Sequence, residues 1–228
     1  MSDVARYLPL SQRPPVDESG VSGGWRPLIA EGLSLVTDML ETLSPEQWDR
    51  DSLCAGWRVR DVAGHLVWWL GSSLPAIVTG GLRTIVRDRV SPLRLTDVEA
   101  RRAGDADPAA ILRSLRAIAA ARAAGTGRAG VGDLAEVVVH GYDIGRAVGY
   151  SLAFPARATG AVALARSLAA PMPVRAVVRH RSLRATDAGW TVGHGAEIAA
   201  PAEALLLFLY RRTGMPPRLS PGGTTPAA

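Results

Sequence analysis

One segment, residues 132–148, constrains the fold most, because it has the composition of a buried helix and also carries a line of ionisable side chains. Steps of three, four and three residues place these groups on one helical face: Asp133, Glu136, His140 and Asp143. Three consecutive valines at 137–139 cover much of the remaining circumference. A buried carboxylate without a partner is strongly unfavourable, so this stripe requires cations from other helices or a metal ion. The segment therefore predicts a helical bundle with a polar centre.

Apolar residues repeat at helical spacing in three further segments before residue 150, which are 27–43, 59 to a kink or end at Pro75, and 108–124. We expect these helices and the 132–148 helix to form an antiparallel four-helix bundle. The basic connection from Gly80 to Arg102 is expected to be irregular, apart from a minor helix near 97–102. On the 108–124 helix, Arg122 is expected to face water.

The pattern changes after Tyr150. An Ala-rich helix is expected over 156–170, an extended segment over 174–186, a turn at 187–189, a returning strand at 190–192 and a last helix over 201–212. The predicted fold class is mainly α with a small α+β domain. The predicted organisation is a mobile leader (1–23), the bundle (24–150), a small α/β domain (151–215) and a mobile tail (216–228).

Composition narrows the class of protein. The chain has 228 residues, 47% of them hydrophobic and 21% charged, which excludes a disordered chain. The net charge is +5, and all of the basic residues are arginine. No basic run alternates with aromatic residues, so no nucleic-acid partner is expected. No segment reaches the roughly 20 apolar residues of a membrane helix, so no membrane partner is expected. A single cysteine, Cys54, excludes an internal disulfide framework and indicates a reducing, cytoplasmic setting. The pattern does not predict an oligomeric state.

His65 lies on the expected inward side of the second helix, where it can face Glu136 and His140. Two imidazoles and one carboxylate suit zinc or another divalent transition metal with an open coordination position. The alternative from spacing alone is a polar cluster without metal, in which His65 pairs with Glu136 and His140 bonds a backbone carbonyl.

Three stretches carry a resemblance to a known family. LSPEQW at 43–48, SLCAGW at 52–57 and VRDV with the following HL at 59–66 form the first, and EVVVHGYD at 136–143 forms the second. Together they resemble the maleylpyruvate isomerase family of mycothiol-dependent, DinB-like proteins. The third consists of ATD at 185–187, WTVG at 190–193 and PAEALL at 201–206. It resembles that family's C-terminal domain, which is related to the sterol carrier protein type 2 fold.

The resemblance implies a divalent metal, usually zinc, held by His65, Glu136 and His140, and mycothiol as the thiol cofactor. A thiol that ligates a metal loses its proton and becomes the nucleophilic thiolate. In the resembled isomerase, the thiol adds to a cis double bond, and rotation and elimination then give the trans product. Asp143 and Arg146 are the expected cofactor-binding residues, with an ion pair between them as the alternative.

Two further expectations concern single side chains. Cys54 is expected to be a buried small apolar residue rather than a nucleophile. The densest basic segment could supply a cation to the site, although a solvated strand face is the favoured interpretation: Arg175, Arg179, Arg181 and Arg184.

The predicted function is that of a metal- and mycothiol-dependent enzyme acting on a small electrophilic substrate, either a cis/trans isomerase or a thiol S-transferase. Two alternatives stay open. One is a binding or sensor protein that keeps metal or mycothiol without turnover, and the other is a small-molecule carrier in which the C-terminal domain holds an apolar ligand.

Overall fold

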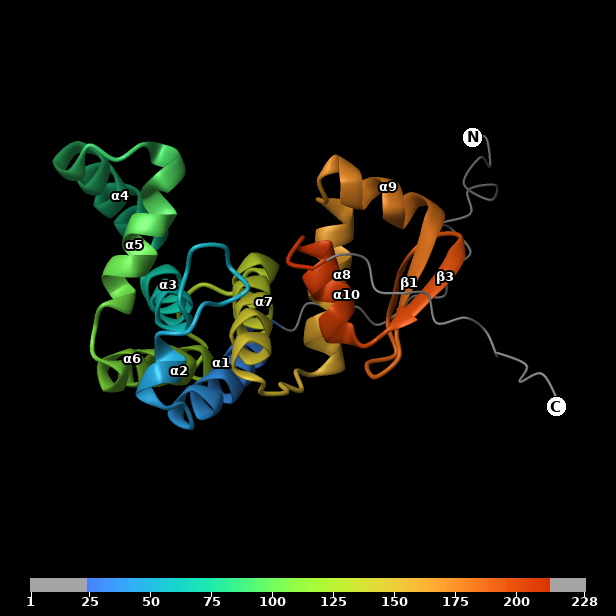
Figure 1. The fold of residues 1–228 in the computed structure, drawn as a ribbon, viewed down its shortest axis with the longest axis horizontal. Helices are drawn as coiled ribbons and strands as arrows, with labels where there is room; N and C mark the ends of the chain where they lie inside the picture. The colour runs from blue at the N-terminus through green and yellow to red at the C-terminus, as the bar shows by residue number, and fades with distance from the viewer. Residues whose placement is uncertain (1–23, 214–228) are drawn as a thin grey trace, which may run out of the picture.

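The computed structural model describes residues 24–213. The predicted mobile leader and mobile tail lie outside the described residues. Within them, a helical bundle is followed by a smaller part that contains a three-stranded sheet (Figure 1). The predicted fold class, mainly α with a small α+β domain, is confirmed.

Four helices form the bundle: α1 (Arg26–Glu41), α3 (Val59–Gly71), α6 (Pro108–Ala123) and α7 (Val131–Val148). They close into a ring, because α1 and α3 each pack against both α6 and α7. The apolar faces predicted from the sequence supply the fully buried core, including Leu33, Leu66, Leu115 and Leu134. The short α2 (Pro45–Trp48), capped by Ser44, leads into the loop that precedes α3.

The prediction of an irregular connection from Gly80 to Arg102 is wrong, because most of this segment is helical. The second helix ends at Gly71, four residues before Pro75, so Pro75 neither ends nor kinks it. Pro75 instead lies in the first turn of α4 (Leu74–Asp88), where a backbone N–H would have no partner within the helix and its loss costs nothing. A 3₁₀ turn, η4 (Pro92–Arg94), and α5 (Leu95–Gly104) complete the segment. Helix α5 packs closely on α3, since a Cβ on Gly64 would lie 2.3 Å from the backbone nitrogen of Gly104.

Arg122 is also placed differently from the expectation. Its side chain is buried and donates a hydrogen bond of 2.7 Å from Nη2 to the backbone carbonyl of Leu70. The guanidinium thus satisfies the open carbonyl end of α3, a common role for a cation near a helix C-terminus.

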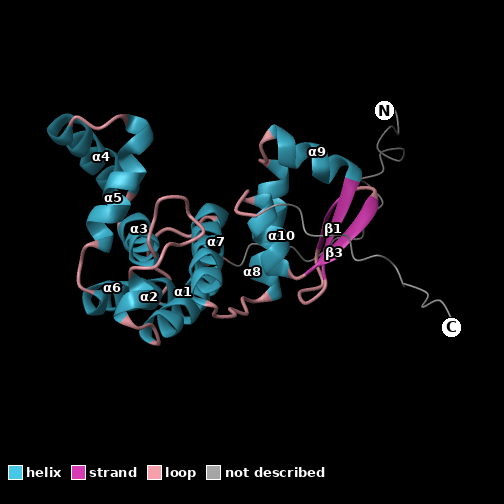
Figure 2. Ribbon diagram, in the orientation of Figure 1, coloured by secondary structure: helices cyan, strands magenta, loops and turns pink. Residues whose placement is uncertain are grey.

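The C-terminal part contains α8 (Ala156–Leu168), α9 (Met172–His180), β1 (Arg181–Ala185), β2 (Thr191–Gly193), β3 (Ala196–Ala200) and α10 (Ala202–Leu209). The sheet order is β2-β1-β3, with β1 antiparallel to β2 and parallel to β3 (Figure 2). The prediction of an extended segment from Val174 is wrong up to His180. Val174 and Val178 lie four residues apart and are both buried on one face of α9. This spacing of buried residues is that of a helix, whereas a strand would bury every second residue. Strand β3 was not predicted.

No single described helix is long and apolar enough to cross a membrane. Helices α8 and α9 reach that length and composition only when taken together, and they are bent by 109° at their junction.

Candidate metal centre

Three side chains from two facing helices converge in the bundle. Helix α7 presents Glu136 and His140 one turn apart, and α3 presents His65 opposite them. Glu136 Oε2 lies 3.0 Å from His65 Nε2 and 3.1 Å from His140 Nε2. Both imidazoles are buried, whereas the Glu136 side chain is 31% exposed, so the cluster opens to solvent at the carboxylate.

This donor set fits a divalent ion. One ligand atom from each residue lies within 4.8 Å of the other two. Two imidazole nitrogens and a carboxylate oxygen form a protein ligand set that catalytic zinc sites use, and they leave a fourth position for water or substrate. Tetrahedral zinc with bonds of about 2.0–2.2 Å separates its ligand atoms by roughly 3.3–3.6 Å. The distances of 3.0 Å and 3.1 Å from Glu136 to the two imidazoles therefore require only a small expansion.

Asp143 fixes the orientation of His140. It is fully buried one turn further along α7, and its Oδ2 lies 3.0 Å from His140 Nδ1. With Nδ1 engaged by the carboxylate, Nε2 is the nitrogen that faces Glu136 and His65. A carboxylate behind a ligating histidine sets its tautomer and raises its basicity.

The electrostatics of the cluster separate the two histidines. Burial lowers the pKa of His65, which is therefore neutral at neutral pH. Burial also acts to lower the pKa of His140, but its hydrogen bonds with Asp143, Cys54 and Glu136 outweigh it and raise that pKa well above its ordinary value. For Glu136, burial acts to raise the pKa, and the hydrogen bonds with His140 and His65 lower it. The raised pKa of His140 favours its protonated form, and a metal ion bound here would displace the proton from Nε2.

Aromatic rings orient His65, whose Nδ1 has no hydrogen-bond partner in the described part of the chain. The centroid of the Trp57 ring lies 5.2 Å from that of His65 and 6.2 Å from that of His140. The rings of Trp68 and Trp69 also lie near His65, with centroids 5.9 Å and 6.4 Å from its own. These rings exclude water from the histidines and leave the Glu136 side open.

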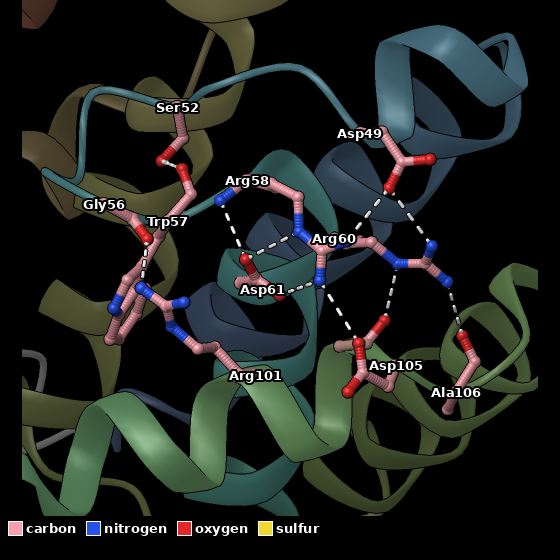
Figure 3. Close-up of polar contacts among 11 residues, drawn as sticks. Asp49, Ser52, Gly56, Trp57, Arg58, Arg60, Asp61, Arg101, Asp105 and Ala106 are labelled. Carbon is pink, nitrogen blue, oxygen red and sulfur yellow. Dashed lines mark hydrogen bonds and ion pairs between the residues drawn. The ribbon is translucent and has the colours of Figure 1, made fainter.

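The loop before α3 brings Cys54 to the cluster, and a polar network holds this loop in place (Figure 3). Ser52 Oγ donates to the backbone carbonyl of Trp57, and Arg101 on α5 donates to that of Gly56 at 2.8 Å. Arg58 binds Asp61, which accepts from the Arg58 backbone N–H in a capping box at the start of α3. The loop is therefore fixed to both α3 and α5.

Cys54 is buried as expected, but it has polar contacts that the sequence did not predict. Its Sγ lies 3.0 Å from Asp143 Oδ2 and 3.5 Å from His140 Nδ1. Burial raises the pKa of the Cys54 thiol, which keeps it protonated and able to donate to Asp143. Its role in this arrangement is to support the carboxylate that orients His140.

Arg212, just after α10, completes the cluster from the C-terminal part. Its Nε lies 3.0 Å and 3.1 Å from the two carboxylate oxygens of Asp143, and its Nη2 lies 3.2 Å from Cys54 Sγ. The set Cys54, His140 and Asp143 also has metal-ligand geometry, but the guanidinium already supplies a positive charge there. Sequence reasoning missed Arg212, because no local pattern links it to residues 69 and 158 positions earlier.

The remaining sequence candidates lie elsewhere. Asp133 pairs with Arg128 at the start of α7, and Arg146 faces Glu203 at 3.8 Å, so the alternative ion pair between Asp143 and Arg146 does not form. Arg184 pairs with Glu197 on the sheet. Arg175 and Arg179 line a separate cavity between α8, α9 and β2. Within residues 24–213, neither these three arginines nor Arg181 forms a hydrogen bond or ion pair with the cluster.

Comparisons with known proteins agree with this architecture. Residues 29–138 match the family model of the mycothiol maleylpyruvate isomerase N-terminal domain. The crystal structure of the mycothiol-dependent maleylpyruvate isomerase aligns with a TM-score of 0.53 and 13% identity, covering 82% of this chain and 88% of that one. A histidine-to-alanine mutant of that isomerase aligns with a TM-score of 0.48 and 14% identity over the same shares. No curated protein matches the sequence. At this identity the structural likeness establishes the fold alone.

Proposed function

We propose that this protein is a mycothiol-dependent enzyme with a divalent metal held by His65, Glu136 and His140. Residues 29–138 match the family model of the mycothiol maleylpyruvate isomerase N-terminal domain, which supports this proposal. One observation carries the proposal: three ligand atoms converge in the bundle, and Asp143 orients one of them. The substrate class is a small electrophile that accepts a thiol, and the reaction is either cis/trans isomerisation or thiol transfer.

Each residue has a distinct part in this proposal. When bound, a zinc ion would stabilise a coordinating thiol as its nucleophilic thiolate. His65 and His140 supply neutral nitrogen ligands, and Glu136 supplies the anionic ligand at the open side. Asp143 holds the ring of His140, and Trp57 covers both imidazoles against water.

Arg212 is the cation on the Asp143 side of the cluster. Its side chain is 28% exposed while its Nε binds Asp143, so solvent reaches part of the guanidinium. Such a group can hold a carboxylate of an acidic electrophile without leaving Asp143. In the proposal Asp143 acts through Arg212 and His140, and its expected role in binding the cofactor stays a prediction. Arg146, which faces Glu203, has no part in the proposal.

The test is thiol-dependent turnover by the purified, zinc-loaded protein. We expect maleylpyruvate and mycothiol to give the trans isomer, and we expect His140→Ala to abolish this turnover. His194→Ala is the matched control, because His194 is exposed on the C-terminal part and should retain the parent rate. The enzymatic proposal would be contradicted if the protein bound mycothiol tightly but formed no product from maleylpyruvate or from a simple electrophile that accepts a thiol. That outcome would favour the binding or sensor alternative.

Thiol accounting separates the two reaction types. An isomerase returns the thiol at the end of each cycle, so product forms without loss of free thiol. A transferase consumes one thiol for each product. Measuring free thiol and product in the same reaction therefore assigns the reaction class.

A further inference from the structure

Helix α4 exposes an unusual amount of apolar surface. Four aliphatic side chains recur every fourth residue along it, and Leu93 on η4 extends the row; their exposed fractions run from 58% to 93%: Leu74, Val78, Leu82, Val86 and Leu93. On an α-helix, steps of four turn by only 40°, so these side chains form one continuous band. The opposite side of the helix is occupied, because Gly81 and Thr84 are buried toward α5. We call the exposed row the α4 apolar band.

The surroundings of the band are basic. Arg83, Arg89 and Arg94 are exposed and have no ion-pair partner among the described residues. Asp88, which precedes Arg89 in the chain, is already paired with Arg87 and Arg102, which lower the pKa of its carboxyl. The positive charge beside the band is therefore uncompensated.

A cavity of about 610 Å³ lies at the end of the band. Arg89, Arg94 and Arg101 line it together with Ser91, between the α4–η4 connection and α5. Of its two acids, Asp88 is paired with arginines, whereas Asp97 accepts from Trp57 Nε1 and keeps its charge, so the three guanidinium groups outnumber the unpaired acid. A cavity with several guanidinium groups suits a phosphate, for which arginine offers paired donors.

We infer that α4 and η4 dock on the surface of an anionic phospholipid membrane, with the α4 apolar band in contact with the acyl chains and a lipid phosphate in the arginine-lined cavity. An aliphatic face bordered by arginine is the pattern of helices that lie in the membrane interface. The location is suitable, because α4 lies at the end of the molecule opposite the sheet, where other elements leave it accessible (Figure 1). This inference departs from the expectation of no membrane partner, which rested on the lack of a spanning segment; a helix that lies on the membrane surface needs none.

Charge decides against a second copy of the chain as the occupant. A symmetric pairing of two α4 bands would bring the unpaired Arg83, Arg89 and Arg94 of both copies to one contact, where these arginines outnumber the nearby acids that have no arginine partner. An anionic lipid surface supplies the missing charge.

Vesicle flotation tests the inference with the full chain. We expect binding to vesicles of phosphatidylcholine with phosphatidylglycerol, and much weaker binding to phosphatidylcholine alone or at high salt. The double variant Arg89→Asn/Arg94→Gln should weaken binding to anionic vesicles about 25-fold, since each cation near such a surface contributes about fivefold. Val78→Asn/Leu82→Asn should weaken binding to both kinds of vesicle.

The matched control is Leu164→Asn/Leu168→Asn, which changes two exposed leucines with the same spacing on α8 and should leave vesicle binding unchanged. Equal binding of all variants, or no preference for anionic vesicles, would overturn the inference. The inference would also fail if light scattering showed a dimer that dissociates in Val78→Asn/Leu82→Asn. It would fail too if inorganic phosphate abolished vesicle binding while Val78→Asn/Leu82→Asn left that binding intact. His140→Ala should keep vesicle binding, so this test is independent of the proposed function.

Discussion

Asp143 is the residue on which the candidate centre depends most. It is completely buried and accepts hydrogen bonds from three side chains that come from three parts of the fold: His140, Cys54 and Arg212. The helical period was enough to place Asp143 beside His140 on the basis of sequence alone. The period could not reveal Cys54 and Arg212 as its other partners, because tertiary packing alone brings those segments together.

Asp143→Asn should weaken metal binding about 10- to 100-fold, the usual effect of losing the carboxylate behind a ligating histidine. Competition with a chromophoric chelator measures this change. Asp133→Asn is the control, since Asp133 lies on the same helix but binds Arg128 and the Gly130 backbone N–H. Equal affinities for the Asp143 variant and the parent would show that Asp143 does not support a ligand.

Metal binding should release about one proton near neutral pH. The pKa of His140 is raised, so its proton must leave, whereas the lowered pKa values of His65 and Glu136 mean that neither carries a proton to lose. Affinity should therefore rise about tenfold per pH unit above the ordinary histidine pKa of about 6.5, until the pH passes the pKa of His140. Calorimetry in buffers of different ionisation enthalpy counts the protons, and a heat independent of the buffer would contradict the assignment.

At the scale of elements, the position of His65 depends on how α3 is packed. Gly64 precedes it and contacts the α5 backbone, with Gly104 opposite. The four bundle helices were predictable because each has a buried apolar face and a polar face. Helices α4 and α9 were not: α4 exposes its apolar residues instead of burying them, and α9 mixes valine with arginine in an order that also fits a strand. Strand β3 has an alanine-rich sequence with little β propensity, so pairing with β1 determines it.

Gly64→Ala should destabilise the protein by about 3 kcal/mol, because the new methyl group meets backbone that cannot move aside. Gly132→Ala is the control on α7, where nothing lies within 4 Å of the added Cβ. There the same change should be neutral or should stabilise by up to about 1 kcal/mol. Urea unfolding measures both, and similar effects at the two sites would contradict the close packing of α3 on α5.

At the scale of the whole molecule, the two parts are joined at the candidate centre. Arg212 carries a positive charge from the end of α10 to a buried carboxylate of the bundle, while Arg146 and Glu203 make a second, more exposed link between α7 and α10. Burial strengthens the first pair and solvent screens the second. The C-terminal part should therefore depend on Asp143 for its attachment.

Double-mutant cycles on the free energy of unfolding compare these links. Asp143→Ala with Arg212→Ala should give a coupling energy of about 1–3 kcal/mol. Arg146→Ala with Glu203→Ala should give about 0–0.5 kcal/mol. A coupling at Asp143 and Arg212 no larger than that of the exposed pair would contradict their joining role.

The most direct test of the account is the metal content of the purified protein, produced without a polyhistidine tag and without added metal. Mass spectrometry should find close to one zinc or other divalent transition-metal ion per chain in the parent, and almost none in His140→Ala. A parent chain that contains no metal and cannot be loaded with zinc would instead identify His65, Glu136 and His140 as a polar core cluster.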